Sequence, residues 1–234
     1  MSGKLYLIPS TLGGCCIGDV LPQRTVDVAN RISRYVVENT RSARRFLSRL
    51  KLSRPIDSLV FAELNEHTPA AEVPHLLAPL LQGFDVGVIS EAGVPAVADP
   101  GAALVSAAHE QGIRVVPLVG PASMLLALMA SGFNGQSFAF SGYLPIKSDE
   151  RIRSLKRLER LSTEGQTQIF MEAPYRNSKL LADIIGACSP RTKLCIAADI
   201  TLESELIATK TLAEWKKGMP DLNKRPCIFL MQRQ

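Results

Sequence analysis

Short apolar runs alternate with longer segments of helical periodicity in the first half of the chain. The apolar runs predict strands at residues 4–8, 58–62, 86–89 and 113–118. The segments between them predict helices at residues 25–38, 42–51, 70–81 and 102–111, with Pro74 and Pro79 interrupting the third. This repeated strand–helix order predicts a parallel sheet that is covered by helices on both faces.

The second half has a different order of elements. Residues 122–131 are almost wholly apolar, which predicts a helix buried between domains or under a partner subunit, with Met124, Leu125 and Leu128 inside. Two more helices are expected at 149–161 and 175–188, and strands at 137–142, 168–171, 194–198, 206–209 and 227–231. The late strands lack long crossovers, so this sheet should be mixed or antiparallel.

The predicted fold class is therefore α/β, with a parallel N-terminal sheet and a mixed C-terminal sheet. Val119-Gly120-Pro121 is the best junction, so we expect domains at residues 1–119 and 120–234. A chain of 234 residues that is 46% apolar and 21% charged has the balance of a globular protein with a sizeable core.

Composition also narrows the class of protein. The longest apolar run is far short of the roughly 20 residues of a membrane helix, and the N-terminus carries no signal pattern, so we expect a cytoplasmic protein. The five cysteines form no C-x-x-C pair, which favours reduced thiols used in packing. His67, His75 and His109 lack metal-ligand spacing, and no metal site is expected.

The formal net charge is +5, and much of the positive charge falls in two clusters. Two interpretations remain open, namely solvated helix faces and a surface for nucleic-acid phosphates. The first cluster is Arg31, Arg34, Arg41, Arg44, Arg45, Arg49, Lys51 and Arg54, and the second is Lys147, Arg151, Arg153, Lys156, Arg157 and Arg160.

Residues 84–101 are the most informative stretch. The apolar run at 86–89 ends in the turn Ser90-Glu91-Ala92-Gly93-Val94-Pro95, and Asp99-Pro100-Gly101 leads into the next helix. Ligands of open α/β sheets bind at the carboxyl ends of the strands, where such turns lie. The chain lacks a Walker lysine, a G-x-G-x-x-G fingerprint, a G-x-S-x-G elbow and an H-E-x-x-H pair, so kinase, dehydrogenase and hydrolase chemistry is not indicated.

The turn resembles the S-D-A-G-T-P signature of the tetrapyrrole methylase superfamily of S-adenosylmethionine-dependent methyltransferases, closest to its ribosomal RNA small-subunit methyltransferase I branch. Other family motifs follow in the same order along the chain. They are Leu5-Tyr6-Leu7-Ile8-Pro9, Glu38-Asn39-Thr40-Arg41, Asn65-Glu66, Val119-Gly120-Pro121-Ala122-Ser123, Gly142-Tyr143-Leu144-Pro145 and Ile169-Phe170-Met171-Glu172-Ala173-Pro174-Tyr175-Arg176.

Four residues depart from the pattern of that branch. Glu91 and Asn39 each replace an aspartate, and Ala62 and Leu64 stand where two histidines precede the Asn-Glu pair. The chain also has no recognisable counterpart of the basic segment that lies near the C-terminus in that branch.

The resemblance implies a homodimer that binds S-adenosylmethionine in a cleft between the two domains. It further implies 2′-O-methylation of a 16S rRNA cytidine, with ribosomal RNA or the 30S subunit as partner. The expected cofactor contacts are Pro9, Ser90, Glu91, Ala92, Gly93, Val94, Pro95, Met171, Glu172, Ala173 and Ala198. The expected substrate contacts are Arg41, Arg44, Arg45, Glu66 and Arg176.

The catalytic base stays unassigned at this point. Glu38, Glu66 and Glu172 are the carboxylates in motifs that resemble the family, and each is equally well a helix cap or an ion-pair partner. Two other functions also stay open. One is methylation of a small tetrapyrrole-like acceptor, and the other is RNA binding without catalysis.

Overall fold

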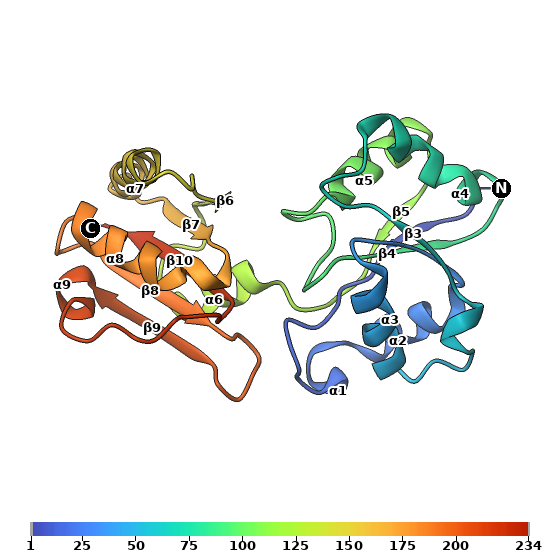
Figure 1. The fold of residues 1–234 in the computed structure, drawn as a ribbon, viewed down its shortest axis with the longest axis horizontal. Coiled ribbons are helices and arrows are strands. Elements are labelled where there is room, and N and C mark those ends of the chain that lie inside the picture. The colour runs from blue at the N-terminus through green and yellow to red at the C-terminus, as the bar shows by residue number, and fades with distance from the viewer. Residues whose placement is uncertain (1, 234) are drawn as a thin grey trace. The chain divides into compact units, whose positions relative to one another are not determined.

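The structure, a computed structural model, describes residues 2–233. The chain divides into two compact units, Met1–Ala122 (unit 1) and Ser123–Gln234 (unit 2). Each unit is built on one five-stranded sheet, with strand order β3-β2-β4-β1-β5 in unit 1 and β6-β7-β10-β8-β9 in unit 2 (Figure 1). The first sheet is parallel, whereas only β6 and β7 are parallel in the second. The predicted α/β class, with one parallel and one mixed sheet, is confirmed.

Unit 1 alternates strands and helices. Its strands are β1 (Leu5–Leu7), β2 (Arg34–Val37), β3 (Val60–Glu63), β4 (Val86–Ile89) and β5 (Val115–Pro117). Its helices are α1 (Ile17–Val20), α2 (Gln23–Arg31), α3 (Thr40–Arg49), α4 (Ala78–Leu81) and α5 (Gly101–Glu110), with 3₁₀ turns η1 (Ile56–Ser58) and η2 (Ala70–Leu77).

Helices cover both faces of this sheet, as predicted (Figure 1). On one face, α2 and α3 pack against Ile8 and Tyr35. On the other face, η2 and α5 pack against Leu5 and Val88. Burial on both faces explains why the strands read as continuous apolar runs in the sequence.

The predicted helix at residues 25–38 is wrong in its second half. Helix α2 ends at Arg31, and residues Arg34–Val37 form β2, which lies between β3 and β4 in the sheet. Tyr35, Val36 and Val37 are aromatic or β-branched and are fully buried there, which favours a strand. Val36 happens to continue the helical spacing of α2, so the hydrophobic pattern did not reveal that the helix ends at Arg31. A second correction concerns residues 70–81, which form a 3₁₀ segment followed by a short helix, because Pro74 and Pro79 lack the N–H of a regular helix.

Unit 2 begins with a helix that covers one face of its sheet. Its helices are α6 (Ser123–Ser131), α7 (Ser148–Ser162), α8 (Asn177–Ala187) and α9 (Leu212–Trp215), with the 3₁₀ turn η3 (Pro174–Arg176). Its strands are β6 (Phe138–Tyr143), β7 (Thr167–Met171), β8 (Lys193–Ala198), β9 (Leu206–Thr211) and β10 (Cys227–Gln232). The core on the other face holds residues of α7, α8 and α9 around Phe170 and Phe229, whose rings stack with centroids 5.9 Å apart.

Helix α6 is not buried on all sides of the single chain, contrary to the sequence prediction. It packs against β9 and β10, so one stripe with Ala127 and Leu128 is buried. Leu125 is 44% exposed and Met129 is 80% exposed. A helix laid on one sheet buries only the side that faces it, even when every side is apolar.

The cysteines lie in different surroundings. Cys188, Cys195 and Cys227 are buried, whereas Cys16 is exposed. Burial raises the pKa of the Cys188 and Cys227 thiols to about 12, so both are protonated packing groups at neutral pH. Within residues 2–233, no cluster of three His, Cys, Asp or Glu side chains could hold a metal ion, and no helix is long and apolar enough to cross a membrane.

Candidate active site

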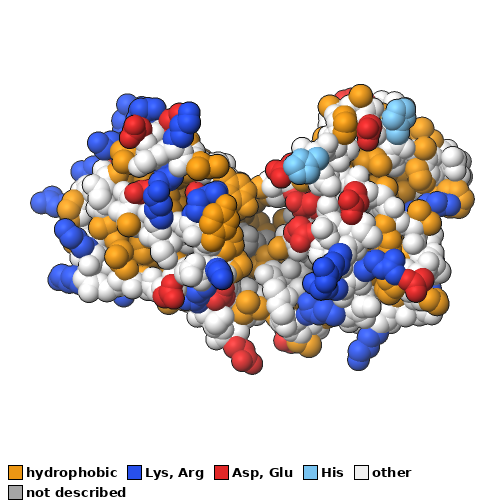
Figure 2. All heavy atoms as spheres, viewed as in Figure 1, with side chains coloured by type: hydrophobic (Ala, Val, Ile, Leu, Met, Phe, Trp, Pro, Cys, Tyr) orange, Lys and Arg blue, Asp and Glu red, His pale blue; other side chains and the backbone are white. Residues whose placement is uncertain are grey.

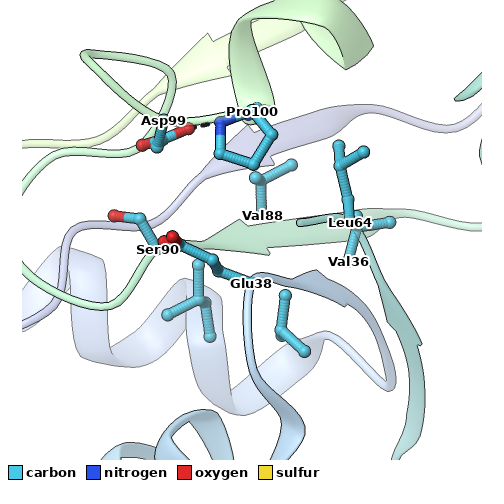
Figure 3. Close-up of a pocket in the computed structure, with 10 residues that line it drawn as sticks. Val36, Glu38, Leu64, Val88, Ser90, Asp99 and Pro100 are labelled. Atoms are coloured by element: carbon cyan, nitrogen blue, oxygen red, sulfur yellow. Dashed lines mark hydrogen bonds between the residues drawn. The ribbon is translucent and has the colours of Figure 1, made fainter. Parts of the chain in front are cut away.

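The carboxyl ends of β2, β3 and β4 meet around a small pocket in unit 1. Glu38 follows β2, Leu64 follows β3, and Ser90 follows β4 (Figure 3). The hollow has room for little more than a water molecule, so a nucleoside would have to lie outside it, over the neighbouring turns. Its lining is Val36, Val37, Glu38, Leu64, Val88, Ile89, Ser90, Asp99, Pro100 and Gly101.

The Ser90–Pro95 turn is fixed by the loop that follows β1. The Ser10 N–H donates to the Gly93 carbonyl at 2.9 Å, and the Ser10 hydroxyl donates to the Ser90 carbonyl at 3.4 Å. Gly93 has φ +73°, and a Cβ there would lie 3.0 Å from Leu12 Cδ2 and 3.1 Å from the Pro121 carbonyl oxygen. The chain itself therefore requires glycine at this position. Glu91 and Ala92 are exposed, and they leave the outer side of the turn open to a ligand.

Pro9 lies beneath this turn and touches another motif. It is buried, and a Cβ on Gly120 would lie only 2.3 Å from the Pro9 Cβ. The backbone of the 119–123 motif therefore approaches Pro9 more closely than any other residue type would allow. Two motifs that are far apart in the sequence are packed together in unit 1. Val94 is half-buried and Pro95 is buried in the same turn.

Glu38 is joined to the turn by a hydrogen bond. Its carboxylate accepts from the Glu91 N–H at 3.2 Å, and the Ser42 hydroxyl donates to the Glu91 carboxylate. Asn39 caps α3, because its Oδ1 accepts from the Arg41 N–H at 2.9 Å and the Ser42 N–H at 3.1 Å. Asn39 and Glu91, both departures from the family pattern, therefore meet at Ser42.

The electrostatic surroundings favour protonation of Glu38. Burial raises the pKa of Glu38, and the negative charges of Asp99, Glu91 and Glu66 raise it further, against the lowering effect of the Glu91 N–H. Leu64 stands where the family pattern has a histidine. It is 4% exposed and lines the pocket, so an apolar wall replaces a group that could carry positive charge.

Asp99 holds the next loop in an unusual conformation. Its Oδ1 accepts from the Gly101 N–H at 2.7 Å and the Ala96 N–H at 3.0 Å, and Ala96 and Ala98 have φ +65° and +59°. Burial raises the pKa of Asp99. Asp99 Oδ2 and Ser90 Oγ are buried, and neither has a hydrogen-bond partner within residues 2–233. Both residues line the hollow, so a water molecule or a small polar group that enters it can pair with these two atoms.

The predicted contacts in unit 2 form a separate cluster at the end of β7. Glu172 is 4% exposed and pairs with Arg176 at 2.5 Å, and it also accepts from the Ala173 N–H at 2.8 Å. Met171 and Ala173 are half-buried. Ala198 is fully buried in β8, and its contact with a cofactor stays a prediction.

The predicted substrate residues differ in availability. Arg44 forms an ion pair with Asp57, whereas Arg41 and Arg45 are exposed one helical turn apart on α3. Glu66 is exposed, with His67 Nε2 at 3.6 Å from its carboxylate.

The two basic clusters are not uniform phosphate surfaces. Arg151 of the second cluster is 2% exposed and bonds to Asp183 at 2.5 Å. In the first cluster, Arg49 donates to the Cys15 carbonyl oxygen. On the face seen in Figure 2, Lys and Arg side chains are spread over both units instead of gathering in one patch.

Comparison with known proteins identifies the family. The profile of the Tetrapyrrole (Corrin/Porphyrin) Methylases matches residues 22–216, which is most of the chain. The chain belongs to this family. The ribosomal RNA small subunit methyltransferase I of Vibrio cholerae is 34% identical over 210 residues, which cover 90% of this chain and 69% of that relative. The protein of the same name from Escherichia coli O157:H7 is 33% identical over 233 residues, covering 98% and 78%.

Solved structures of this tetrapyrrole methylase family share the fold. The methyltransferase CobJ superposes with a TM-score of 0.67 at 18% identity, covering 99% of this chain and 95% of CobJ. Uroporphyrin-III C-methyltransferase from Thermus thermophilus, solved with S-adenosylhomocysteine, has a TM-score of 0.58 at 15% identity, covering 99% and 98%. Family membership and the methyltransferase relatives make this chain an S-adenosylmethionine-dependent methyltransferase.

Proposed function

We propose that this methyltransferase acts on RNA of the small ribosomal subunit, at the ribose 2′-hydroxyl of a cytidine. The observation that carries this proposal is the relationship to ribosomal RNA small subunit methyltransferase I, at 33% identity over 98% of the chain. The solved tetrapyrrole enzymes share only 15–18% identity over a similar length, which indicates a common fold. RNA is therefore favoured over a small tetrapyrrole-like acceptor.

S-adenosylmethionine is proposed to bind on the outer side of the Ser90–Pro95 turn, and the contacts expected of Met171, Glu172 and Ala173 stay a prediction. The cofactor supplies a methyl group on a positively charged sulfonium, which is already activated toward attack. Ala92 is exposed and small, so the backbone of the turn is accessible to adenosine.

Glu38 is proposed as the group that accepts the proton of the acceptor hydroxyl. A ribose hydroxyl is barely ionised at neutral pH, so its attack gains from a base whose pKa is above that of an ordinary carboxylate. Of the three carboxylates considered from the sequence, Glu172 is occupied by its ion pair with Arg176, and Glu66 is fully in solvent. Glu38 has a raised pKa and lies at the open edge of the sheet.

The proposed location is the cytoplasm, because ribosomal RNA is the proposed substrate, and the proposed working form is a homodimer. The exposed apolar side chains of Leu125 and Met129 on α6 support a further packing partner. Light scattering at several protein concentrations tests this assembly, and a constant monomeric mass would contradict it.

The substrate is tested by incubating the protein with S-adenosylmethionine labelled in its methyl group and one of three acceptors. These are 30S subunits, protein-free 16S rRNA and a small porphyrinogen. We expect label in the ribosomal RNA alone. The labelled nucleotide should resist alkaline cleavage on its 3′ side, because a methylated 2′-oxygen cannot attack the neighbouring phosphate.

Two variants give the assay its controls. Ala92→Leu should abolish transfer by covering the turn without disturbing the fold, since Ala92 is exposed. Ala102→Leu, an equally large change at an exposed position of α5, should leave transfer unchanged. Label in the porphyrinogen and none in the RNA would overturn the proposed substrate. Transfer by Ala92→Leu at the rate of the unmodified protein would overturn the placement of the cofactor.

A further inference from the structure

Two tyrosines are exposed at the carboxyl end of the parallel pair β6 and β7. Tyr143 is 59% exposed and Tyr175 is 67% exposed, whereas Tyr6 and Tyr35 are 8% and 1% exposed. Tyrosine carries a large apolar ring, and solvent exposure of two such rings near one strand edge leaves a surface that can bind a planar partner.

A bulge in β6 places Tyr143 at this edge. Residues Phe138, Ala139 and Phe140 pair with Thr167, Gln168 and Ile169, but Met171 then pairs with Tyr143. Between these two pairs, β6 advances by three residues, from Phe140 to Tyr143, whereas β7 advances by two, from Ile169 to Met171. Gly142, with φ +62°, allows the irregularity. In a regular ladder Gly142 would stand beside Met171, so the bulge puts an aromatic ring where a glycine would otherwise lie.

Arg176 lies against the ring of Tyr175. Its guanidinium lies 4.9 Å from the centroid of the Tyr175 ring, and its Nη1 donates to the Tyr175 hydroxyl at 2.7 Å. The hydrogen bond that Arg176 donates to buried Glu172 raises the pKa of Arg176, and Tyr175 and Tyr143 contribute in the same direction. Tyr143 comes to the same edge from the neighbouring strand, because it pairs with Met171 at the end of β7.

The side chain of Arg151 anchors the loop that follows Tyr143. Arg151 of α7 is 2% exposed, donates to the Ile146 carbonyl at 2.6 Å and bonds to Asp183 of α8. Because a buried arginine with several partners has little freedom, this anchor limits movement of residues 144–146. Ile146, in that loop, is 68% exposed beside the tyrosine. The loop beside the exposed rings is therefore fixed to α7 and α8 through Arg151.

We propose that Tyr143, Tyr175 and Arg176 form a stacking platform for unpaired bases of the RNA substrate. This inference rests on the proposed function, because it names the part of the protein that binds the same RNA. Aromatic rings and an arginine guanidinium are the groups on which splayed bases stack. The platform extends recognition beyond Arg41 and Arg45, which offer charge without an aromatic face.

Direct binding measurements test the platform without relying on methyl transfer. The anisotropy of a short, unstructured, labelled oligoribonucleotide gives the affinity for the full-length protein and for Tyr143→Ala and Tyr175→Ala. Phenylalanine variants at the two positions keep the ring. Phe138→Ala removes a 39% exposed ring at the opposite end of β6 and serves as the matched control. Thermal unfolding followed by circular dichroism verifies that each variant is folded.

We expect each alanine to weaken binding about tenfold, and each phenylalanine variant and Phe138→Ala to bind almost normally. An oligoribonucleotide with abasic sites keeps its phosphates, so it should bind the unmodified protein more weakly and the doubly substituted Tyr143→Ala/Tyr175→Ala protein without further loss. Equal affinities of the alanine variants and the unmodified protein would overturn the platform and leave the proposed function standing. Failure of the unmodified protein to bind either RNA would overturn both.

Discussion

The Glu38 carboxylate accepts a hydrogen bond from the Glu91 N–H at 3.2 Å, across the ends of the neighbouring strands β2 and β4. This bond joins the residue with a raised pKa to the turn proposed to hold the cofactor. A change at either residue should therefore affect both the pH dependence and the cofactor site.

Glu38→Gln should raise stability at neutral pH and lower the rate of methyl transfer. Burial raises the pKa of Glu38, so the folded state retains this proton at a pH where the unfolded chain, with a carboxyl pKa of about 4.3, has lost it. Stability therefore falls as pH rises from the unfolded value through the folded one. Glutamine can still accept from the Glu91 N–H, and it removes the buried charge. Melting temperatures should differ most near pH 8 and converge near pH 4. A difference in melting temperature that grows on acidification would contradict the raised pKa of Glu38.

Gly93→Ala should destabilise the protein more than Gly132→Ala. Both glycines have φ +73°, which costs an L-residue about 1–2 kcal/mol. A Cβ at Gly132 meets nothing within 4 Å, whereas one at Gly93 meets Leu12 and the Pro121 carbonyl at 3.0 and 3.1 Å. Denaturant unfolding gives both costs, and calorimetry with S-adenosylmethionine should show weaker binding for Gly93→Ala alone. Equal losses of unfolding free energy in the two variants would show that the Leu12 side chain moves to make room for the added Cβ.

Leu128→Ala should cost about 2–5 kcal/mol of unfolding free energy, because it empties a buried site between α6 and the sheet. Leu128 is 8% exposed, whereas Leu125 on the same helix is 44% exposed. At protein concentrations where the chain is monomeric, Leu125→Ala should therefore stay within about 0.5 kcal/mol of the unmodified protein. A comparable loss at both positions in urea unfolding would show that another surface covers Leu125 in solution.

Arg41→Glu combined with Arg45→Glu should weaken RNA binding and reduce its salt dependence. Both arginines are exposed on one side of α3, so each can neutralise a phosphate, and each contact adds roughly one to the slope of log affinity against log salt. Arg44→Met is the matched control, because Asp57 already pairs with that charge. S-adenosylmethionine binding should not change. An unchanged slope in the double variant would place the RNA elsewhere.

The sequence predicted the class of both sheets because their hydrophobic patterns differ. Continuous apolar runs such as Val86–Ile89 predicted buried parallel strands, and late strands without crossovers predicted the mixed sheet. The strand β2 was missed, because Val36 continues the helical spacing of α2 and only the tertiary position between β3 and β4 settles its conformation. Likewise, the apolar run of α6 could not reveal that only one side meets the sheet.

The site was predicted less completely. The turn at Ser90–Pro95 was found from small residues after an apolar run, and Glu38 was noted as one of three carboxylates. Burial and the charges of Asp99, Glu91 and Glu66 raise its pKa, and these surroundings are brought together only by the parallel register. The exposure of Tyr143 follows from a bulge, and a lone Gly142 was the only signal of it in the sequence.

Asn39 and Glu91 have a shared consequence for how this protein can vary. The Ser42 hydroxyl donates to Glu91 and lies 3.2 Å from Asn39 Oδ1, so a single side chain serves both. Changing Asn39 alone to aspartate would add a second negative charge beside Glu91, and shortening Glu91 alone would withdraw its carboxylate from Ser42. Because both residues meet at Ser42, the effects of exchanging Asn39 and Glu91 on stability should not be additive, and the double exchange should cost less than the sum of the two single ones.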